Sequence, residues 1–209
     1  MVYRLSQIIA ICAIAALGIT ACYSPQQRQA TKRNIPIELR DGDVAFRRGM
    51  GLTSNIILIT NRSGHYSHVG MVKSVNNKWC VIHEVPYEGE SEEDDKIYCE
   101  EIEEFFNTIK ASSGAIYRLE GLDSSQIATV CNYTLKHLEC NTPFDHDYDL
   151  SDDSKLYCSE LAWRSYMQIG IDISNGSRTD VRTLKINSEQ IIFPADIETS
   201  RVLAPIYEF

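Results

Sequence analysis

The stretch that decides the fold is Lys155-Leu156-Tyr157-Cys158-Ser159-Glu160-Leu161-Ala162-Trp163. A polar, acidic segment precedes it, and apolar residues at helical spacing predict a helix from Cys158 to Ile169 that ends at Gly170. A thiol at a helix N-terminus lies near free N–H groups and the positive end of the macrodipole, which favour the thiolate. The pattern therefore predicts a nucleophilic cysteine, which needs a base close by.

The candidate base and its orienting partner lie in one predicted hairpin, whose turn falls at Asn76-Asn77-Lys78. A turn of three residues would put His68 and Glu84 on the same face, within side-chain reach of each other. A turn of two residues would put His83 on that face instead, because side chains alternate between faces along a strand. The sequence leaves both registers open, and we favour Glu84 because a carboxylate orients an imidazole well.

The remaining patterns predict short strands and a few helices, which together indicate an α+β fold with a small, mainly antiparallel sheet. Strands are expected within residues 39–46, 68–75, 79–86 and 114–119, with closing strands or extended segments at 191–196 and 202–207. Helices are expected at residues 51–59, 102–109 and 124–138, and residues 88–95 form an acidic loop.

The N-terminus has the features of a bacterial lipoprotein signal. Residues 1–21 carry Arg4 and then an apolar run too short for a comfortable membrane span. Ile19-Thr20-Ala21-Cys22 resembles a lipobox, which implies cleavage before Cys22 and lipidation of its thiol. We expect a signal peptide at 1–21, a lipidated tether at 22–36 and one domain at 37–209. Aspartate is absent after the lipidation site (Tyr23), which slightly favours the outer membrane of a bacterial envelope.

Composition narrows the class of partner. The formal net charge of −9 argues against nucleic acid as a partner and suits a domain exported from the cytoplasm. Export permits disulfides, but the cysteines outside the signal and lipid site are odd in number, which leaves at least one thiol free. These cysteines are Cys80, Cys99, Cys131, Cys140 and Cys158, and their pairing stays open.

Five blocks resemble, in this order along the chain, the permuted papain-like amidases of the YaeF/YiiX type, relatives of the NlpC-type cysteine peptidases. The blocks are Leu39-x-x-Gly42-Asp43-Val44-x-Phe46, Tyr66-Ser67-His68-Val69-Gly70-Met71-Val72, Glu84-Val85, Pro143-Phe144-Asp145 and Tyr157-Cys158-Ser159-Glu160-Leu161-Ala162-Trp163. The resemblance covers about residues 38–207. The histidine block precedes the cysteine block, which is the permuted order.

The resemblance implies a papain-like core with Cys158 as nucleophile, His68 as base and Glu84 as the residue that orients the base. It places Tyr66 and Tyr157 at the oxyanion or substrate site, beside the backbone N–H of the nucleophile. It implies acyl transfer through a thioester, with no metal or organic cofactor. The expected substrates are peptidoglycan stem peptides or other N-acyl amino-acid amides.

Other functions fit the sequence less well. A lipid amide or ester hydrolase on the same fold, and an envelope binding module without activity, are the alternatives. A zinc site around His65 and His68 does not match structural zinc spacing. The Asp145-x-Asp147-x-Asp149 run lacks the glycine and glutamate that an EF-hand loop requires.

Overall fold

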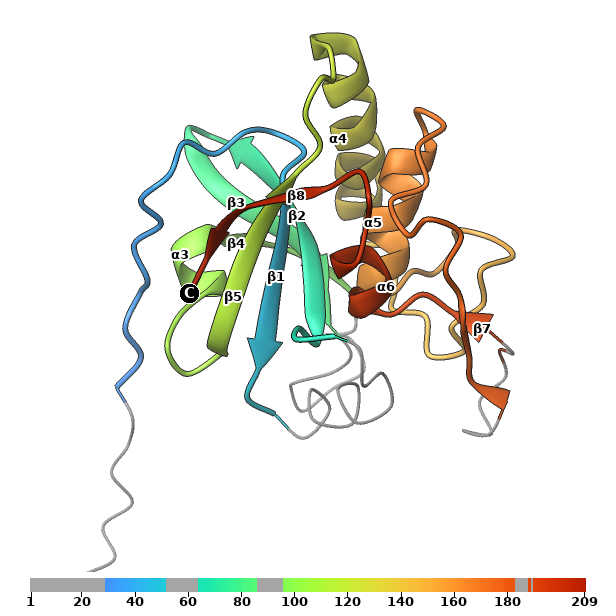
Figure 1. Cartoon of the computed structure of the whole chain (residues 1–209), viewed down its shortest axis with the longest axis horizontal. Helices are drawn as coiled ribbons and strands as arrows, with labels where there is room; N and C mark the ends of the chain where they lie inside the picture. Colours follow the sequence, from blue (N-terminus) through green and yellow to red (C-terminus); the bar gives the residue numbers. More distant parts are fainter. Residues whose placement is uncertain (1–28, 52–63, 86–95, 183–187, 189) are drawn as a thin grey trace, which may run out of the picture.

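A six-stranded antiparallel sheet in the order β4-β3-β2-β1-β5-β8 organises the protein in a computed structural model (Figure 1). The structure describes residues 29–51, 64–85, 96–182, 188 and 190–209. Four predicted segments lie outside these residues, apart from Gly51: the signal peptide, the lipidation site, the helix 51–59 and the acidic loop 88–95. The strands are β1 (Val44–Gly49), β2 (His68–Val75), β3 (Lys78–Glu84), β4 (Ile97–Glu101), β5 (Ala111–Arg118) and β8 (Ala204–Glu208), and β6 (Thr179–Asp180) and β7 (Gln190–Ile191) form a separate pair.

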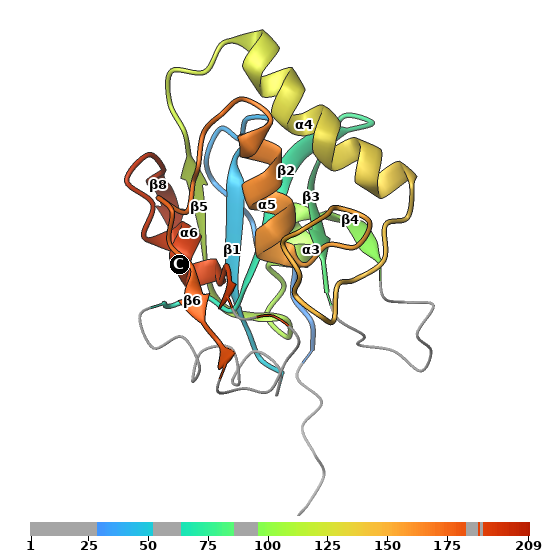
Figure 2. The same ribbon diagram turned by 90° about the vertical axis from the view of Figure 1, so that its right-hand side faces the viewer.

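Four helices flank the sheet in the described part of the chain: α3 (Ile102–Phe105), α4 (Ser124–Glu139), α5 (Cys158–Met167) and α6 (Pro194–Glu198). Figure 2 shows α4 and α5 lying across one face of the sheet, with α3 on the other face. The α+β fold and its antiparallel sheet confirm the prediction from the sequence.

Alternation along the strands builds a separate core on each face. Val69 and Met71 pack with the helix α5 core, while Val72 packs with the core that contains Phe105 and Phe106 of the opposite face. A side chain on β2 therefore faces either the α5 side or the α3 side according to its position in the strand.

The β2–β3 hairpin has a turn of two residues. Val75 pairs with Lys78, and the residues between them, Asn76 and Asn77, have φ of 52° and 63°. Two positive φ values in succession are typical of the type I′ turn that matches strand twist, and asparagine tolerates this conformation. The register that the sequence left open is therefore the two-residue one.

A buried ion pair holds the start of β1 to the end of β5. Arg118 donates from Nε and Nη2 to the two carboxylate oxygens of Asp43, each at 2.7 Å. Next to this pair, the Tyr166 hydroxyl of α5 donates to the carbonyl of Gly42 at 2.6 Å. In the Gly42-Asp43-Val44 block, Asp43 is thus a structural residue that ties β1 to β5, and the Gly42 carbonyl ties helix α5 to the sheet.

Helix α4 begins with a full capping box, because Asp123 accepts from the Gln126 backbone N–H while the Gln126 side chain accepts from the Asp123 N–H. Helix α5 begins directly after Tyr157, which has extended backbone angles. Both helices match the predicted segments within two residues at each end.

Two predictions of local structure differ from the structure, and one strand was missed. The helix expected at 102–109 ends at Phe105, because the chain turns there to enter β5 at Ala111. The extended segment expected at 191–196 contains helix α6, which has Pro194 at its first position. Strand β4 was not predicted at all, because charged residues interrupt its apolar pattern.

The end of the predicted tether lies against the domain. The Thr31 N–H donates to Thr108 Oγ1 at 3.1 Å, and the guanidinium of Arg33 lies 3.9 Å from the ring centre of Phe209. Ile35 packs at the edge of the core on the α3 side. Within the residues that the structure describes, no helix is both long and apolar enough to cross a membrane.

Candidate active site

Cys158 is the first residue of α5 and is nearly buried, with 9% of its surface exposed. Its sulfur lies 3.8 Å from Ser159 Oγ and accepts from the backbone N–H of Val69, the second residue of β2. The thiol therefore lies at the first turn of α5, beside the beginning of the strand that carries His68.

Burial raises the pKa of the Cys158 thiol above its ordinary value, and N–H groups of Ser159 and Val69 only partly offset this. The negative charge of Glu84 raises the pKa further. The thiolate expected from the helix N-terminus alone is thus not the resting form, because desolvation outweighs the donors around the sulfur.

His68 begins β2 and forms a pair with a second histidine. Its Nε2 lies 2.9 Å from His83 Nδ1, and the two rings are almost perpendicular at 81°. Both rings lie beside Phe105, at 5.8 and 5.1 Å between ring centres. Both histidines are buried, at 7% and 3% exposure, and burial lowers both pKa values, to about 4 for His83.

Glu84 does not share a face with His68, because the hairpin has the two-residue turn and not the three-residue turn that would have placed them together. With the two-residue turn at Asn76–Asn77, alternation along β3 places His83 on the α3 side with His68 and turns Glu84 to the α5 side. Glu84 is fully buried there, and its charge acts on the Cys158 thiol instead.

The thiol and His68 lie at the first residues of β2 but on opposite sides of the sheet, near the point where β2 and β3 separate. In the described residues, the β2–β3 ladder ends at the pair Met71–Ile82, and the last residues of β3 pair with β4. Val69 contacts the sulfur from the α5 side, while its neighbour His68 projects toward the α3 side. No hydrogen bond joins the Cys158 sulfur to His68 within the described chain, and such contacts often tighten only when substrate binds.

Of the two tyrosines predicted for the oxyanion site, Tyr66 packs in the same buried cluster as Cys158, and Tyr157 directly precedes Cys158 in the chain. The charges of Glu208 and Glu198 act on the Tyr66 phenol, together with burial, and raise its pKa to about 12, which places the ring toward β8 and α6. The Tyr157 hydroxyl accepts from the backbone N–H of Ile192 at 3.0 Å inside a buried cluster.

A tyrosine that the sequence analysis missed is close to the nucleophile. Tyr148 packs edge-on against Tyr157 at 5.1 Å between ring centres. Burial and the charge of Cys158 raise the pKa of its phenol to about 12, so the hydroxyl keeps its proton. Its φ of 56° is unusual for a bulky residue, and such backbone strain occurs most often at functional positions.

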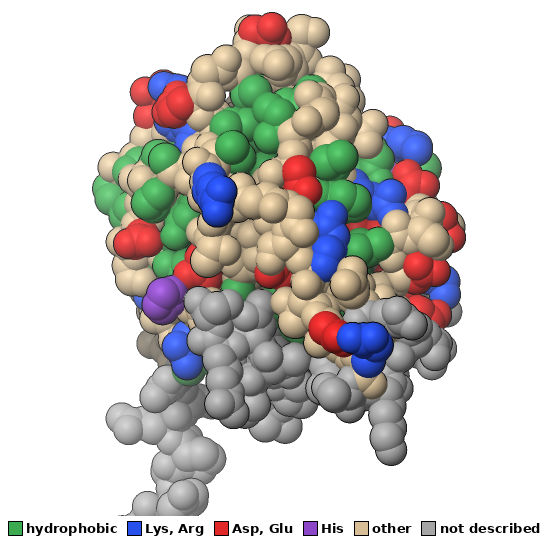
Figure 3. All heavy atoms as spheres, turned by 45° about the vertical axis from the view of Figure 1, so that its right-hand side comes forward, with side chains coloured by type: hydrophobic (Ala, Val, Ile, Leu, Met, Phe, Trp, Pro, Cys, Tyr) green, Lys and Arg blue, Asp and Glu red, His purple; other side chains and the backbone are tan. Residues whose placement is uncertain are grey.

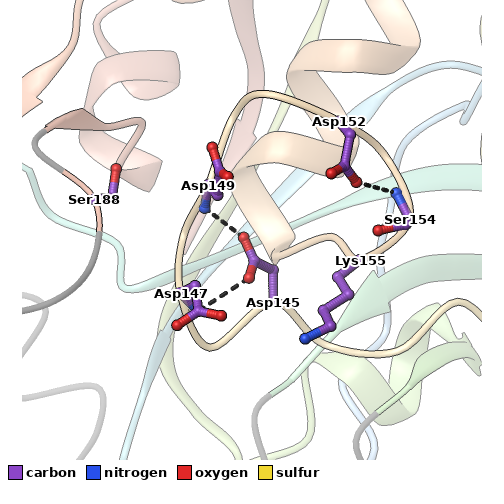
Figure 4. A pocket seen from close by; sticks show the side chains of 7 residues that line it. All are labelled: Asp145, Asp147, Asp149, Asp152, Ser154, Lys155 and Ser188. Carbon is purple, nitrogen blue, oxygen red and sulfur yellow. Dashed lines mark hydrogen bonds between the residues drawn. The ribbon is translucent and has the colours of Figure 1, made fainter.

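The loop that carries Tyr148 also forms an acidic pocket of about 570 Å³ (Figure 4). It is lined by Asp145, Asp147, Asp149, Asp152, Ser154, Lys155 and Ser188. The Asp145 carboxylate accepts from the backbone N–H groups of Asp147 and Asp149, at 2.9 and 2.5 Å. Asp145 therefore shapes the loop, and the pocket favours cationic over anionic groups.

The residues considered for a zinc site lie apart. The exposed His65 pairs with Glu198 through Nδ1 and Oε1 at 2.5 Å, whereas His68 is buried against His83. Across the described residues, no group of three or more histidine, cysteine, aspartate or glutamate side chains is arranged to hold a metal ion.

On the face shown in Figure 3, acidic and basic side chains are interspersed.

Comparisons with known proteins point the same way as this geometry. A family model described as permuted papain-like amidase enzyme, YaeF/YiiX, C92 family, matches residues 38–204. A crystal structure described as metalloprotein yiiX from Escherichia coli O157:H7 has a TM-score of 0.68 at 18% identity, covering 83% of this chain and 99% of that chain. That likeness shows the fold. Among curated proteins, none matches.

Proposed function

We propose that this chain, which belongs to the permuted papain-like amidases, hydrolyses amide bonds with Cys158 as nucleophile and His68 as base. Membership of this family makes the protein a cysteine amidase or peptidase. The observation that carries the residue assignment is the position of the Cys158 thiol at the start of α5, against the first residues of β2, where His68 is held by His83.

The proposed reaction starts from a neutral thiol and a neutral imidazole, since burial raises the pKa of Cys158 and lowers that of His68. As the sulfur attacks the amide carbon, its proton passes to His68, and a carbon–sulfur bond forms. His68 gives this proton to the leaving amine when the carbon–nitrogen bond breaks. Water then attacks the thioester with His68 as base, which releases the acid and restores the thiol.

We assign the orienting role to His83 instead of Glu84. His83 Nδ1 engages the Nε2 of His68, which leaves the other ring nitrogen of His68, Nδ1, as the one that can take the thiol proton. Glu84, on the other face, adds negative charge next to the sulfur and helps to keep the thiol protonated at rest.

For the oxyanion we propose the backbone N–H of Cys158 and the Tyr148 hydroxyl. The first lies at the N-terminus of α5, where N–H groups have no partner within the helix. The second keeps its proton and lies within electrostatic reach of the thiol. This assignment replaces Tyr66 and Tyr157.

The substrate class remains the one that the sequence suggested: peptidoglycan stem peptides or related N-acyl amino-acid amides. An acidic pocket on the Tyr148 loop supports a substrate with a free amine, such as the diamino acid of a stem peptide. A lipid attached to Cys22 would hold the enzyme at the envelope membrane, beside such substrates.

Turnover by purified protein tests this function directly. The protein is incubated with peptidoglycan fragments and with N-acyl amino-acid amides, and products are identified by mass spectrometry. We expect new amines and acids with wild type and none with Cys158→Ala. Release of acyl groups from lipid amides or esters alone would favour the lipid hydrolase. Binding of fragments without any turnover would identify a binding module.

A further inference from the structure

A carboxylate on β4 continues the line of contacts that starts at His68. Glu100 Oε2 lies 3.3 Å from His83 Nε2, the ring nitrogen that His68 does not engage. In the β3–β4 ladder, Glu100 pairs with Val81, and Tyr98 pairs with His83 two positions further along β3. Sequence patterns did not indicate Glu100, because β4 itself was not predicted.

Cations hold Glu100 in the ionised form. Lys110 Nζ hydrogen-bonds to Glu100 Oε1, and the Arg47 guanidinium lies 3.6 Å from Oε2. Contacts with His83 and Lys110 lower the pKa of Glu100 to about 2 despite its burial. Arg47 is itself fixed, because it donates to the Phe105 carbonyl at 3.1 Å and stacks over the ring of that residue at 4.5 Å.

An ionised carboxylate accepts hydrogen bonds and cannot donate one. The 3.3 Å contact does not have hydrogen-bond geometry, but the negative charge of Glu100 beside Nε2 favours the proton of neutral His83 on that nitrogen, which makes His83 Nδ1 an acceptor. His83 Nδ1 in turn requires the proton of neutral His68 to be on Nε2. Only Nδ1 of His68 is then left with a lone pair, and this is the atom that the proposed function needs as base.

We propose that Glu100 is a positioning residue for the amidase reaction, acting through His83 to hold His68 in the tautomer that can accept the thiol proton. The inference rests on the proposed function for its catalytic meaning. Its structural content, two histidines in the Nε2–H form, can be measured without any substrate. Arg47, Lys110 and Tyr98 are the other charged or titratable groups beside the pair, and Glu104 contacts Lys110 at 3.4 Å.

Substitution by glutamine should invert the chain of donors. In Glu100→Gln, the single amide oxygen should accept the hydrogen bond from Lys110, so the amide N–H₂ group should face His83 Nε2. His83 then becomes the Nδ1–H tautomer and donates to His68 Nε2, which moves the His68 proton to Nδ1. A wrong histidine tautomer of this kind lowers turnover strongly while leaving the geometry intact.

The test is ¹⁵N NMR of the imidazole nitrogens at neutral pH, with the signals of His68 and His83 assigned from His68→Gln and His83→Gln. We expect both residues to be Nε2–H in the wild type and in Glu101→Gln, a matched control. Glu101 is the next residue of β4 and pairs with Lys32 and Lys78 at the surface. In Glu100→Gln, both should change to Nδ1–H, whereas Glu100→Asp, which keeps the carboxylate, should keep Nε2–H.

Either of two results would overturn the proposal: an Nδ1–H form of His83 in the wild type, or unchanged tautomers in Glu100→Gln. The first does not need Glu100→Gln, so it decides the matter even if that variant fails to fold. Where turnover is measurable, Glu100→Gln should lower kcat by at least about tenfold at unchanged KM. An inactive wild type with the expected tautomers would refute the proposed function and leave only the structural content standing, in which Glu100 sets the tautomers of His83 and His68.

Discussion

His68 Nε2 lies 2.9 Å from His83 Nδ1, on the side of the sheet opposite to the helix that carries Cys158. The pair forms because a two-residue turn sets the hairpin register, and it is enclosed by Phe105. The first residue of β2 thus connects the two faces: its side chain contacts His83, and the next backbone N–H contacts the thiol.

The register makes a prediction about which residue orients the base. His83→Gln should lower kcat about tenfold to hundredfold, because the glutamine amide can donate to His68 Nε2 as well as accept from it, so the tautomer of His68 is no longer fixed. Glu84→Gln, one residue further along β3, is the matched control and should keep a larger share of the activity. Steady-state kinetics on the same amide compare them. A loss in Glu84→Gln that exceeds the loss in His83→Gln would restore the first assignment.

The second prediction concerns the Tyr148 hydroxyl as an oxyanion donor. Tyr148→Phe removes only the hydroxyl and should lower kcat by about 10²-fold, the usual effect of losing one oxyanion donor. KM should change little, since the donor acts on charge that develops in the transition state. Tyr66→Phe, whose phenol lies toward Glu208 and Glu198, should stay close to wild type. Equal losses in the two variants would remove the oxyanion role from Tyr148.

The pKa of Cys158 makes a third prediction, about alkylation by iodoacetamide. Only the thiolate reacts, and burial raises the thiol pKa above 9.0, so the rate should be low at pH 7 and increase through pH 9. Glu84→Gln removes a negative charge beside the sulfur, which lowers the pKa, so alkylation at pH 8 should be faster than in the wild type. Peptide mass spectrometry separates this label from label on other cysteines. A wild-type midpoint well below 8.5 would contradict the neutral resting pair.

The buried pair of Asp43 and Arg118 makes a prediction about stability. Arg118→Met leaves the Asp43 carboxylate buried without its partner and should lower the free energy of unfolding by about 3–5 kcal/mol. Glu120→Gln breaks an exposed ion pair with Arg40 and should change it by less than about 1 kcal/mol. Urea denaturation measures both. Similar small changes in the two variants would show that Asp43 does not anchor β1 to β5.

Much of this fold could be predicted from the sequence, because its helices and hairpin strands have clear periodicity. The nucleophile helix, helix α4 and the β2–β3 hairpin are where the patterns placed them. Residues that depend on long-range pairing could not be predicted. Glu100 reaches His83 only because β4 pairs with β3, and the pattern of β4 is too polar to read as a strand.

The choice between His83 and Glu84 depended on whether the turn has two or three residues, and sequence patterns predict turn length only weakly. Asn76-Asn77 fits a two-residue turn, but the following Lys78 fits a three-residue loop equally well. Tyr148 was missed for a different reason: it lies in a loop, where periodicity carries no information about which side chain turns toward the nucleophile.

The central claim is that Cys158 forms a covalent acyl intermediate, and intact-mass spectrometry after mixing with an acyl p-nitrophenyl ester tests it most directly. We predict that one acyl group appears on the wild type within the first turnover, that peptide mapping places it on Cys158, and that Cys158→Ala lacks it. In His68→Ala, the acyl group should form more slowly and persist longer, because the base serves both steps. Equal acylation of wild type and Cys158→Ala, or an acyl group found on another residue, would contradict the account.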